Sequence, residues 1–153
     1  MMKNIDTPMD VEVKLIHPEE TEYVKIGCHK VDERIDEITR FIKSRQGSFE
    51  GYTEGDMYNV PIADVFYIES VDDRTFLYLE KETYESRKRL YELEKVTDSF
   101  HFIRISKSVI VNLMKVDSIK PAMNGRFSCK LKNGEEVIIS RKYVSALKDK
   151  LKG

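Results

Sequence analysis

The sequence predicts a mostly β fold with short helices, in the α+β class. From about residue 49 onward, short segments alternate apolar and polar residues, and this period of two is typical of half-buried strands. Turn residues separate these segments at regular intervals, among them the pairs Asn124-Gly125 and Asn133-Gly134. Helical spacing is sustained in only one long segment of the first half and in two shorter ones later. Short strands therefore dominate the expected fold.

The first part of the chain is expected to hold one or two strands and one helix. Residues 1–10 read as a loose tail, Val11–Ile16 alternates as a strand does, and Tyr23–Ile26 is the candidate for a second strand after the break at His17–Glu20. Apolar residues then recur every three or four positions, which predicts a helix ending near Gly47: Val31, Ile35, Ile38, Phe41 and Ile42. These elements cannot form a core alone, so they are expected to pack on the later part of the chain or on a partner.

The middle of the chain is expected to form a run of strands closed by a short helix. The expected strands are Phe49–Thr53, Met57–Pro61, Val65–Val71, Phe76–Lys81 and Thr83–Glu85. Asp72-Asp73-Arg74 reads as a polar turn between two of them. A short helix is expected over Arg87–Val96, since Leu90, Leu93 and Val96 share one face.

The last third is expected to be a short strand, a meander and a final helix. Phe102–Ile105 is short and apolar, and Val109–Leu113 fits either a strand or a tight helical turn. Three strands come next, at Lys115–Pro121, Phe127–Lys132 and Glu135–Ile139. Asn-Gly suits a type I′ turn, so Lys132–Glu135 is expected to be a two-residue hairpin. Ser140 is the expected N-cap of a helix that carries Val144, Leu147 and Leu151 on one face.

Composition limits the class of protein. The chain has 153 residues, 41% hydrophobic and 35% charged, which fits one soluble domain with a short extension and excludes a disordered or collagen-like chain. No segment approaches the roughly 20 apolar residues of a membrane span, and the start lacks the apolar run of a signal peptide. Cys28 and Cys129 lie far apart without a CxxC spacing, so a reduced, cytoplasmic protein without a zinc site or disulfide framework is expected.

The charges are distributed unevenly along the chain. Residues 1–100 carry 14 Lys and Arg against 23 Asp and Glu, whereas residues 101–153 carry 12 against 4. A basic segment at the end of an acidic chain is typical of a surface that binds a polyanion. The simpler interpretation is that lysine-rich ends keep the protein in solution.

No catalytic constellation is found. His17, His29 and His101 are scattered without metal-ligand spacing, and no nucleophile, phosphate-loop or dinucleotide motif occurs. Asp64 and Glu69 would point to opposite faces of a strand, which is unsuitable for paired acid–base chemistry. The sequence therefore predicts no catalytic residues and no cofactor, metal or small-molecule substrate. It predicts a protein that is not an enzyme.

Several motifs, in order, resemble the LytTR DNA-binding domain family. The segment FIRISKSVIVNL at Phe102–Leu113 is similar to the family's F-x-R-x-[HS]-[KR]-S-x-[IV]-V-N signature. Ile62–Ser70 resembles its opening I-x-Y-I-E-S strand, and Leu90–Leu93 followed by Phe100–Arg104 resembles its L-x-x-L…F-x-R stretch. Leu131–Gly134 and Ile139–Tyr143 resemble its closing motifs. The resemblance covers about residues 55–151.

The resemblance implies an elongated stack of small antiparallel sheets and a bacterial transcription regulator. Family members bind direct repeats in double-stranded promoter DNA, with loops entering successive major grooves. The three base-contacting positions correspond to Arg74/Thr75, Lys107 and Arg141. Ser108 is expected to act mainly as a cap and Asn112 as a structural group at a strand end. The full set of candidate DNA-binding residues is Arg74, Thr75, Arg104, Lys107, Ser108, Asn124, Arg126, Arg141 and Lys142.

The expected organisation is a β-α extension over residues 1–54, with a regulatory or oligomerisation role, and a LytTR-type DNA-binding domain over residues 55–153. The segment before the resemblance is too short for a receiver domain. The family implies two further partners, a second copy of the chain on DNA and, as for some stand-alone members, a membrane-protein inhibitor.

Three other function classes stay open. The main alternative is a β-rich protein–protein signalling module with a basic partner-binding face. An RNA-binding β domain ranks third, because the aromatic residues alternate as core positions and do not interleave with basic residues on one sheet face. An enzyme comes last.

Overall fold

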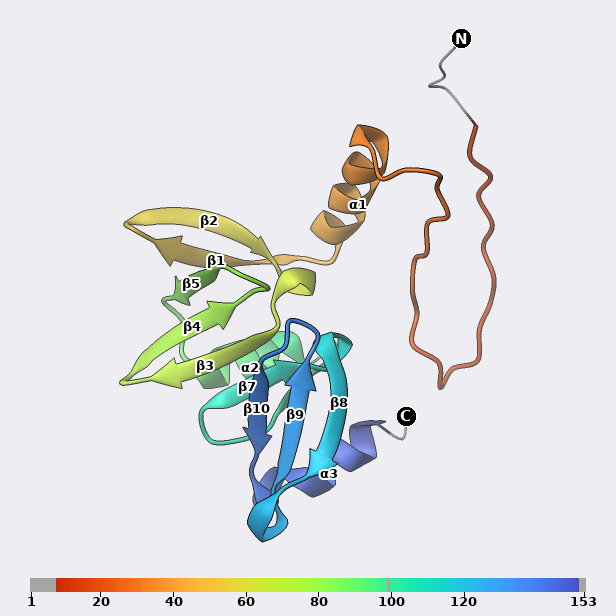
Figure 1. Cartoon of the computed structure of the whole chain (residues 1–153). Coiled ribbons are helices and arrows are strands. Elements are labelled where there is room, and N and C mark those ends of the chain that lie inside the picture. The colour runs from red at the N-terminus through yellow and green to blue at the C-terminus, as the bar shows by residue number, and fades with distance from the viewer. Residues whose placement is uncertain (1–7, 99, 152–153) are drawn as a thin grey trace.

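The computed structural model describes residues 8–98 and 100–151, apart from the side chain of Ser44. Within them, two antiparallel sheets follow one another along the molecule (Figure 1). The helices are α1 (Glu33–Arg45), α2 (Leu90–Thr97) and α3 (Arg141–Leu151), with three short 3-10 helices, η1 (Ile62–Asp64), η2 (Leu113–Lys115) and η3 (Met123–Gly125). The predicted α+β class is confirmed.

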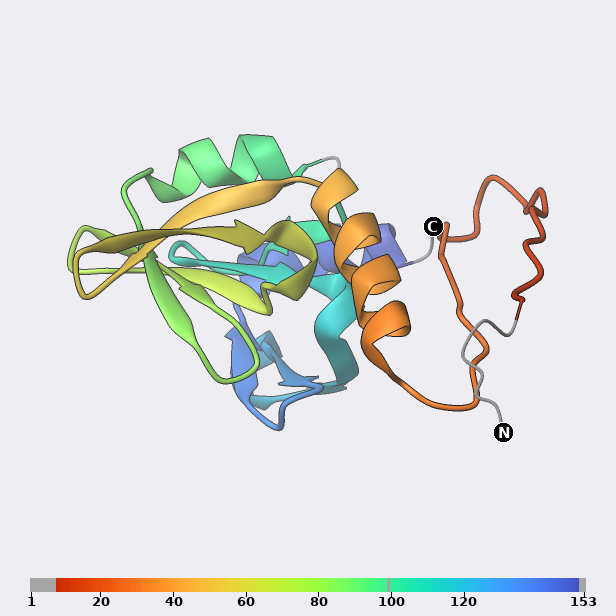
Figure 2. The same ribbon diagram turned by 90° about the horizontal axis from the view of Figure 1, so that it is seen from above.

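The larger sheet has seven strands in the order β2-β1-β5-β4-β3-β7-β6. These strands are β1 (Ser48–Thr53), β2 (Asp56–Pro61), β3 (Tyr67–Val71), β4 (Arg74–Tyr78), β5 (Thr83–Ser86), β6 (Phe102–Arg104) and β7 (Val109–Asn112). Helix α2 lies along one face of this sheet (Figure 2). The core beneath it includes Val65, Ile68, Leu77, Leu93 and Ile110.

The smaller sheet has three strands, in the order β10-β9-β8, and it leads into α3. Its strands are β8 (Val116–Pro121), β9 (Phe127–Leu131) and β10 (Glu136–Ile139). It closes a second core against the opposite face of the larger sheet, and this core includes Ile105, Val111, Leu131, Ile139 and Leu147. Each fully buried aliphatic side chain of this kind contributes roughly 1.5–3 kcal/mol.

The central strands β3 and β7 face both cores. Side chains alternate along a strand, so Ile68 of β3 and Ile110 of β7 enter the first core, whereas Tyr67 and Val111 enter the second. Burial on both faces requires consecutive apolar residues and removes the period of two. The structure thus resolves the ambiguous segment as strand β7, followed by the single turn η2.

Helix α1 is tied to the start of the larger sheet. Asp32 caps it through a hydrogen bond from the backbone N–H of Ile35 to Oδ1 at 3.1 Å. Near its other end, Lys43 Nζ lies 2.7 Å from Asp64 Oδ1 of η1. The predicted helix is confirmed, although it begins after Val31.

The two strands expected at Val11–Ile16 and Tyr23–Ile26 do not form in this chain. Residues 8–16 and 21–30 hold no regular element, and no described residue pairs with them as a neighbouring strand. Alternation alone does not make a strand, because the backbone groups also need a partner. Of the tail expected over residues 1–10, residues 1–7 lie outside the described residues and residues 8–10 hold no regular element.

The turns differ from expectation in one hairpin. Asn124 and Gly125 both have positive φ, at 58° and 75°, as a type I′ turn requires. In the hairpin between β9 and β10, only Gly134 has positive φ, at 93°. Hydrogen bonds from Gly134 N–H to the Leu131 carbonyl and from Leu131 N–H to the Glu135 carbonyl close a three-residue loop there. The expected two-residue turn is therefore wrong, although the hairpin exists.

The predicted division at residue 54 falls in the turn between β1 and β2. These strands pair along their whole lengths, and Tyr52 of β1 is also paired with Glu85 of β5. The division into an extension and a DNA-binding part stays a prediction, with β1 physically part of the larger sheet. Among the helices described, none combines the length and apolar character that a membrane crossing needs.

Candidate nucleic-acid interface

Four segments at strand ends lie along one side of the molecule, which we call the loop end: residues 71–74, 105–109, 122–126 and 139–142, the last of which includes the first two residues of α3. Backbone hydrogen bonds join three of them. The N–H of Ser70, the residue just before the first segment, donates to the Ser108 carbonyl, and the N–H of Ser140 donates to the Ile105 carbonyl, both at 2.9 Å. The fourth is adjacent because Phe127 of β9 pairs with Ile139 of β10. These segments follow one another down one side of the molecule (Figure 1).

The first segment presents Arg74 and hides Thr75. Asp72 and Asp73 both have positive φ, at 50° and 64°, and form a tight hairpin turn. Arg74 is exposed, and its guanidinium holds Glu85 through two hydrogen bonds of 2.7 and 3.1 Å. The bonds from Arg74 lower the pKa of the Glu85 carboxyl. Thr75 is only 4% exposed, so its side chain is not presented to a ligand at this surface.

Arg104 shapes the second segment from inside. Its Nε donates to the Ser106 carbonyl at 2.8 Å, one terminal nitrogen donates to Glu94 Oε1 of α2 at 2.6 Å, and the other donates to the Lys107 carbonyl. A guanidinium used on three sides in this way is not free for a ligand. Arg104 instead fixes the backbone of the turn that carries Lys107.

Lys107 is exposed at the tip of this turn. Within residues 8–98 and 100–151, no hydrogen bond or ion pair is found for its ammonium group. Ser108 contributes through its backbone, with its N–H donating to Ser106 Oγ at 3.2 Å and its carbonyl accepting from Ser70. The turn therefore holds Lys107 toward solvent on an ordered backbone.

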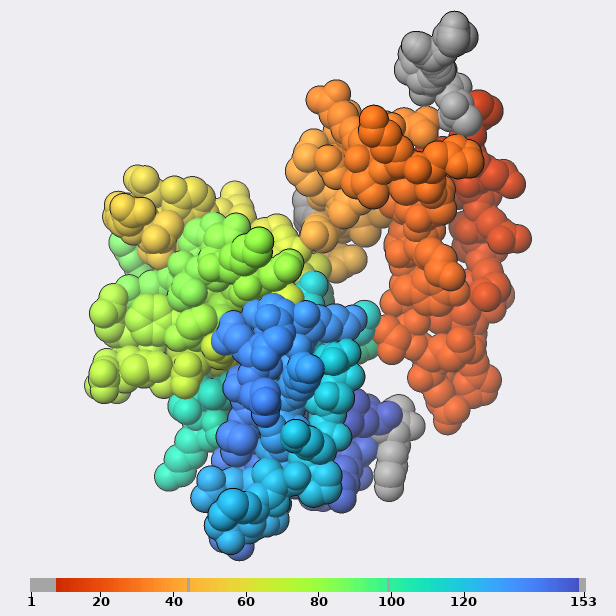
Figure 3. Space-filling view, viewed as in Figure 1, coloured from red at the N-terminus to blue at the C-terminus, as the bar shows by residue number. Residues whose placement is uncertain are grey.

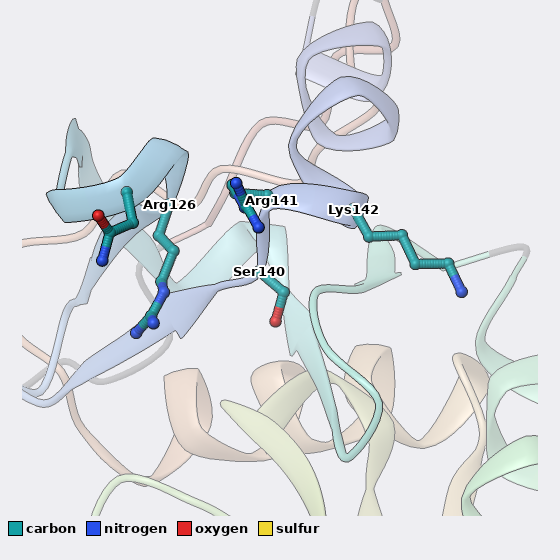
Figure 4. A pocket seen from close by; sticks show the side chains of 5 residues that line it. Arg126, Ser140, Arg141 and Lys142 are labelled. Atoms are coloured by element: carbon teal, nitrogen blue, oxygen red, sulfur yellow. The ribbon is translucent and has the colours of Figure 1, made fainter.

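The last two segments together form an open basic hollow. It is lined by Asn124, Arg126, Ser140, Arg141 and Lys142 and has a volume of about 580 Å³. Figure 4 shows Arg126 and Lys142 on opposite sides of Ser140, with Arg141 between them. Three cations line this hollow and no carboxylate does, which suits a polyanion.

Gly125 makes room for Arg141. A Cβ atom at this position would lie 2.7 Å from Arg141 Cδ and 3.0 Å from Cγ. The aliphatic part of Arg141 therefore rests on the glycine, and the turn supports the side chain that follows β10. This contact joins residues far apart in the sequence, so no local pattern could have revealed it.

A second hollow, between the two sheets, is acidic. Glu69, Glu136, Tyr67 and Arg126 contribute to its lining, and its volume is about 560 Å³. The Tyr67 hydroxyl donates to Glu135 Oε1 at 2.9 Å. Burial, and after it this hydrogen bond, raises the pKa of Tyr67 well above its ordinary value. The ring of Tyr67 stacks on Tyr78 at 4.4 Å, so this cluster braces the sheets. In the part of the chain that the structure describes, no group of three or more His, Cys, Asp or Glu side chains could hold a metal ion.

The structure thus sorts the predicted site residues into three groups. Asn124, Arg126, Arg141 and Lys142 share the basic hollow. Lys107 and Arg74 lie exposed on neighbouring turns. The remaining three are held inside the fold or used to order a turn: Thr75, Arg104 and Ser108. Sequence reasoning missed the supporting residues Gly125, Glu85 and Glu94.

Comparison with known proteins gives consistent matches. A family model described as the LytTr DNA-binding domain matches residues 55–152. A solved LytTr DNA-binding domain of a Bacillus cereus protein, described as a methyl-accepting/DNA response regulator, is 30% identical with a TM-score of 0.66, covering 69% of this chain and 96% of that chain.

Curated relatives match beyond that domain. Proteins named as HTH-type transcriptional regulators from Staphylococcus aureus strains MSSA476 and MW2 are each 28% identical over 139 residues, covering 89% of this chain and 94% of the relative. Such a match is longer than residues 55–152, so it includes part of the preceding segment. In the described ranges, strands separate α1, α2 and α3, and no two helices follow each other as in a helix-turn-helix.

Proposed function

The chain belongs to the LytTR DNA-binding domain family, and from that premise we propose that it regulates transcription by reading direct repeats in promoter DNA. The loop end supplies the reading surface, with its segments entering successive major grooves. No helix is inserted lengthwise in a groove in this proposal, although Arg141 and Lys142 are the first two residues of α3. DNA as the ligand implies action in the cytoplasm, with double-stranded promoter DNA as the principal partner.

The single observation that carries this proposal is the placement of Lys107 and Arg141 at one end of the fold. Both are exposed, and the backbone hydrogen bond from Ser140 to Ile105 links the turn that carries Lys107 to the start of α3, where Arg141 lies. Arginine can donate two hydrogen bonds to O6 and N7 of one guanine, and lysine can donate to the same atoms. Two such side chains, one on a turn and one at the start of a helix bonded to that turn, can read two positions in a fixed register.

The other basic residues have supporting roles in this proposal. Arg126 and Lys142 border the hollow around Arg141 and contact phosphates, which position the protein without reading sequence. Arg74 contacts DNA by exchanging Glu85 for a phosphate or a base. Arg104 acts as a positioning residue for Lys107, because its guanidinium is already engaged.

Binding to the promoter of the protein's own gene, measured with competitor DNA, tests this function. Lys107→Ala and Arg141→Ala should each lower specific affinity by about 5- to 150-fold, because a base contact is worth about 1–3 kcal/mol. Lys81→Ala removes an equal charge at the opposite end of the fold and should bind normally. Lys81 follows Glu80, whose carbonyl accepts a hydrogen bond of 3.4 Å from Asn133 Nδ2. Asn133 is in the hairpin between β9 and β10, at the ends of these strands that lie away from the loop end. Equal affinity of all three variants would refute the assignment.

Salt dependence separates DNA binding from the alternative of a basic face for a protein partner. About six phosphate contacts give a slope of log affinity against log salt concentration near −5. A complex whose affinity does not change with salt would favour the protein partner.

The segment before β1 is proposed to regulate the domain or to mediate association. The family resemblance suggests a membrane-protein inhibitor as one partner and a second copy of the chain on DNA as another. Deletion of residues 1–48 should leave DNA affinity in place and change oligomeric state or regulated output. If DNA affinity, oligomeric state and regulated output are all unchanged by the deletion, the segment has no such role.

A further inference from the structure

Residues 8–32 form an open loop of chain that stands apart from the two sheets (Figures 1 and 2). A turn in which the Glu20 N–H donates to the His17 carbonyl reverses its direction. The space-filling view shows it as a separate column beside the body (Figure 3). We call this segment the arm.

One stretch of the arm has the side-chain pattern of a strand and lacks a partner. Val11, Val13 and Leu15 are 84%, 89% and 97% exposed, and Glu12 and Lys14 alternate with them. Among the described residues, no hydrogen bond is found for the backbone groups of residues 12–16. An alternating segment of valine and leucine with unpaired backbone groups can form a strand if a second strand supplies the hydrogen-bond partners.

The stretch Val11–Leu15 is complementary to itself. When two copies pair antiparallel about a twofold axis at Val13, Glu12 of each lies opposite Lys14 of the other. The same register places Val11 opposite Leu15 and the two Val13 side chains opposite each other. All six apolar side chains then share one face, and the two ion pairs share the other. A shift that centres on Glu12 or Lys14 would set like charges opposite each other.

We propose that Val11–Leu15 is a self-association strand, and that its partner is the same strand of a second copy of this chain. A twofold axis through Val13 makes the contact isologous and closed, so it gives a dimer. The Val11 N–H already bonds to Asp10 Oδ1 at 3.1 Å. In an antiparallel pair, the backbone N–H and C=O groups of every second residue point to the partner strand. If those of Glu12 and Lys14 do so, the N–H of Val11 points away from the partner strand and keeps its bond to Asp10.

The charge of the arm argues against DNA as its partner. Residues 8–32 carry six Asp and Glu against three Lys and Arg, so phosphates repel the segment. The Staphylococcus aureus relatives also match part of the chain before residue 55, as expected if this segment belongs to their common architecture. The inference does not depend on the proposed DNA function.

The contact is small, so the dimer is expected to be weak in free solution. Two short strands bury much less than the roughly 1,200–2,000 Å² of a stable interface. Two copies held close together gain from a high effective concentration. A weak strand pair would therefore matter most where two copies sit side by side.

Sedimentation velocity of the full chain without DNA tests the proposal. The wild-type chain should dimerise with micromolar or weaker affinity. Glu12→Lys and Lys14→Glu should each weaken the dimer by about tenfold or more, because two attractive cross-strand pairs become two repulsive ones. Glu12 and Lys14 are exposed and belong to neither core, so these variants should fold normally.

Two combinations restore the pairing and identify its register. The double variant E12K/K14E exchanges both charges, and it should dimerise as the wild type does. A mixture of the two single variants should form a heterodimer, since one strand then carries two lysines and the other two glutamates. Lys30→Glu, also in the arm and outside the strand, is the matched control and should leave the dimer intact.

Each result decides for or against the proposal. Loss of the dimer in both single variants, with recovery in the double variant and in the mixture, supports it. A wild-type chain that stays monomeric up to millimolar concentration overturns it. A dimer that tolerates both charge reversals also overturns it, because association would then run through another surface. DNA binding enters none of these readouts, so failure here is distinct from failure of the proposed function.

Discussion

Gly125→Ala displaces Arg141 without removing its guanidinium. Gly125 has φ of 75°, and a Cβ there would meet Arg141 Cδ at 2.7 Å. Gly134 is the matched control, because its φ is 93° and no atom lies within 4 Å of a Cβ placed there. Both substitutions impose a left-handed conformation on alanine, at a cost of about 1–2 kcal/mol. Only the first also pushes on the side chain assigned to base reading.

The geometry sets the magnitude. Carbon atoms in contact prefer about 3.5–4.0 Å, so Arg141 must shift by roughly 1 Å. A recognition side chain tolerates about 0.5 Å before its hydrogen bonds are lost. Losing a bidentate guanine contact costs about 1–3 kcal/mol, which is about a 5- to 150-fold loss of specific affinity.

Fluorescence anisotropy with the protein's own promoter at fixed salt measures this effect, and urea unfolding measures stability. Both glycine variants should lose similar stability, and only Gly125→Ala should lose specific affinity. Adding Gly125→Ala to Arg141→Ala should cause no further loss, because both remove the same contact. Wild-type affinity in Gly125→Ala, or an equal loss in Gly134→Ala, would refute the role assigned to Arg141.

Three further results are expected. Arg104→Ala should lower specific affinity in anisotropy as far as Lys107→Ala does, and additive losses in the double variant would contradict a shared role. Glu85→Gln should raise DNA affinity several-fold at low salt and less at high salt, because it removes a negative charge beside Arg74 and releases the Arg74 guanidinium for DNA. Unchanged DNA affinity at low salt would contradict this role of Arg74. Burial raises the pKa of the Cys129 thiol to about 11, so it stays protonated at neutral pH, and mass spectrometry should find iodoacetamide only on Cys28 until urea unfolds the chain.

The fold was predictable wherever one face of a strand is buried. Alternation located β1 within one residue, because buried and exposed positions alternate from Ser48 to Gly51. Alternation failed at β7, where Val109, Ile110 and Val111 are all buried by cores on both faces. Only the three-dimensional arrangement shows that this segment lies between two layers.

The arm shows the opposite failure. Val11–Ile16 alternates as a strand does, and the chain offers it no neighbouring strand within the described residues. A sequence pattern reports which face a strand would bury, and it carries no information on whether a partner lies in the same molecule. Self-complementary charges at Glu12 and Lys14 supply that missing information.

The sequence predicted the exposed residues of the candidate site and did not predict the residues that hold them in position. The motif resemblance located Lys107 and Arg141, both of which lie exposed at the loop end. It could not separate Arg104 from them, because the bond from Arg104 to Glu94 joins a strand to a helix ten residues away. Support by Gly125 depends on a contact across 16 residues of chain and has no local signature.

Selection of binding sites from random duplex DNA tests the central claim most directly, that the loop end reads sequence through Lys107 and Arg141. The wild-type chain should select two repeats whose centres lie a whole number of helical turns apart, at roughly 10–10.5 base pairs per turn. Arg141→Ala should lose preference at one base of each repeat and Lys107→Ala at a different base, with the remaining positions unchanged. Selection of one identical motif by all three proteins would contradict the account.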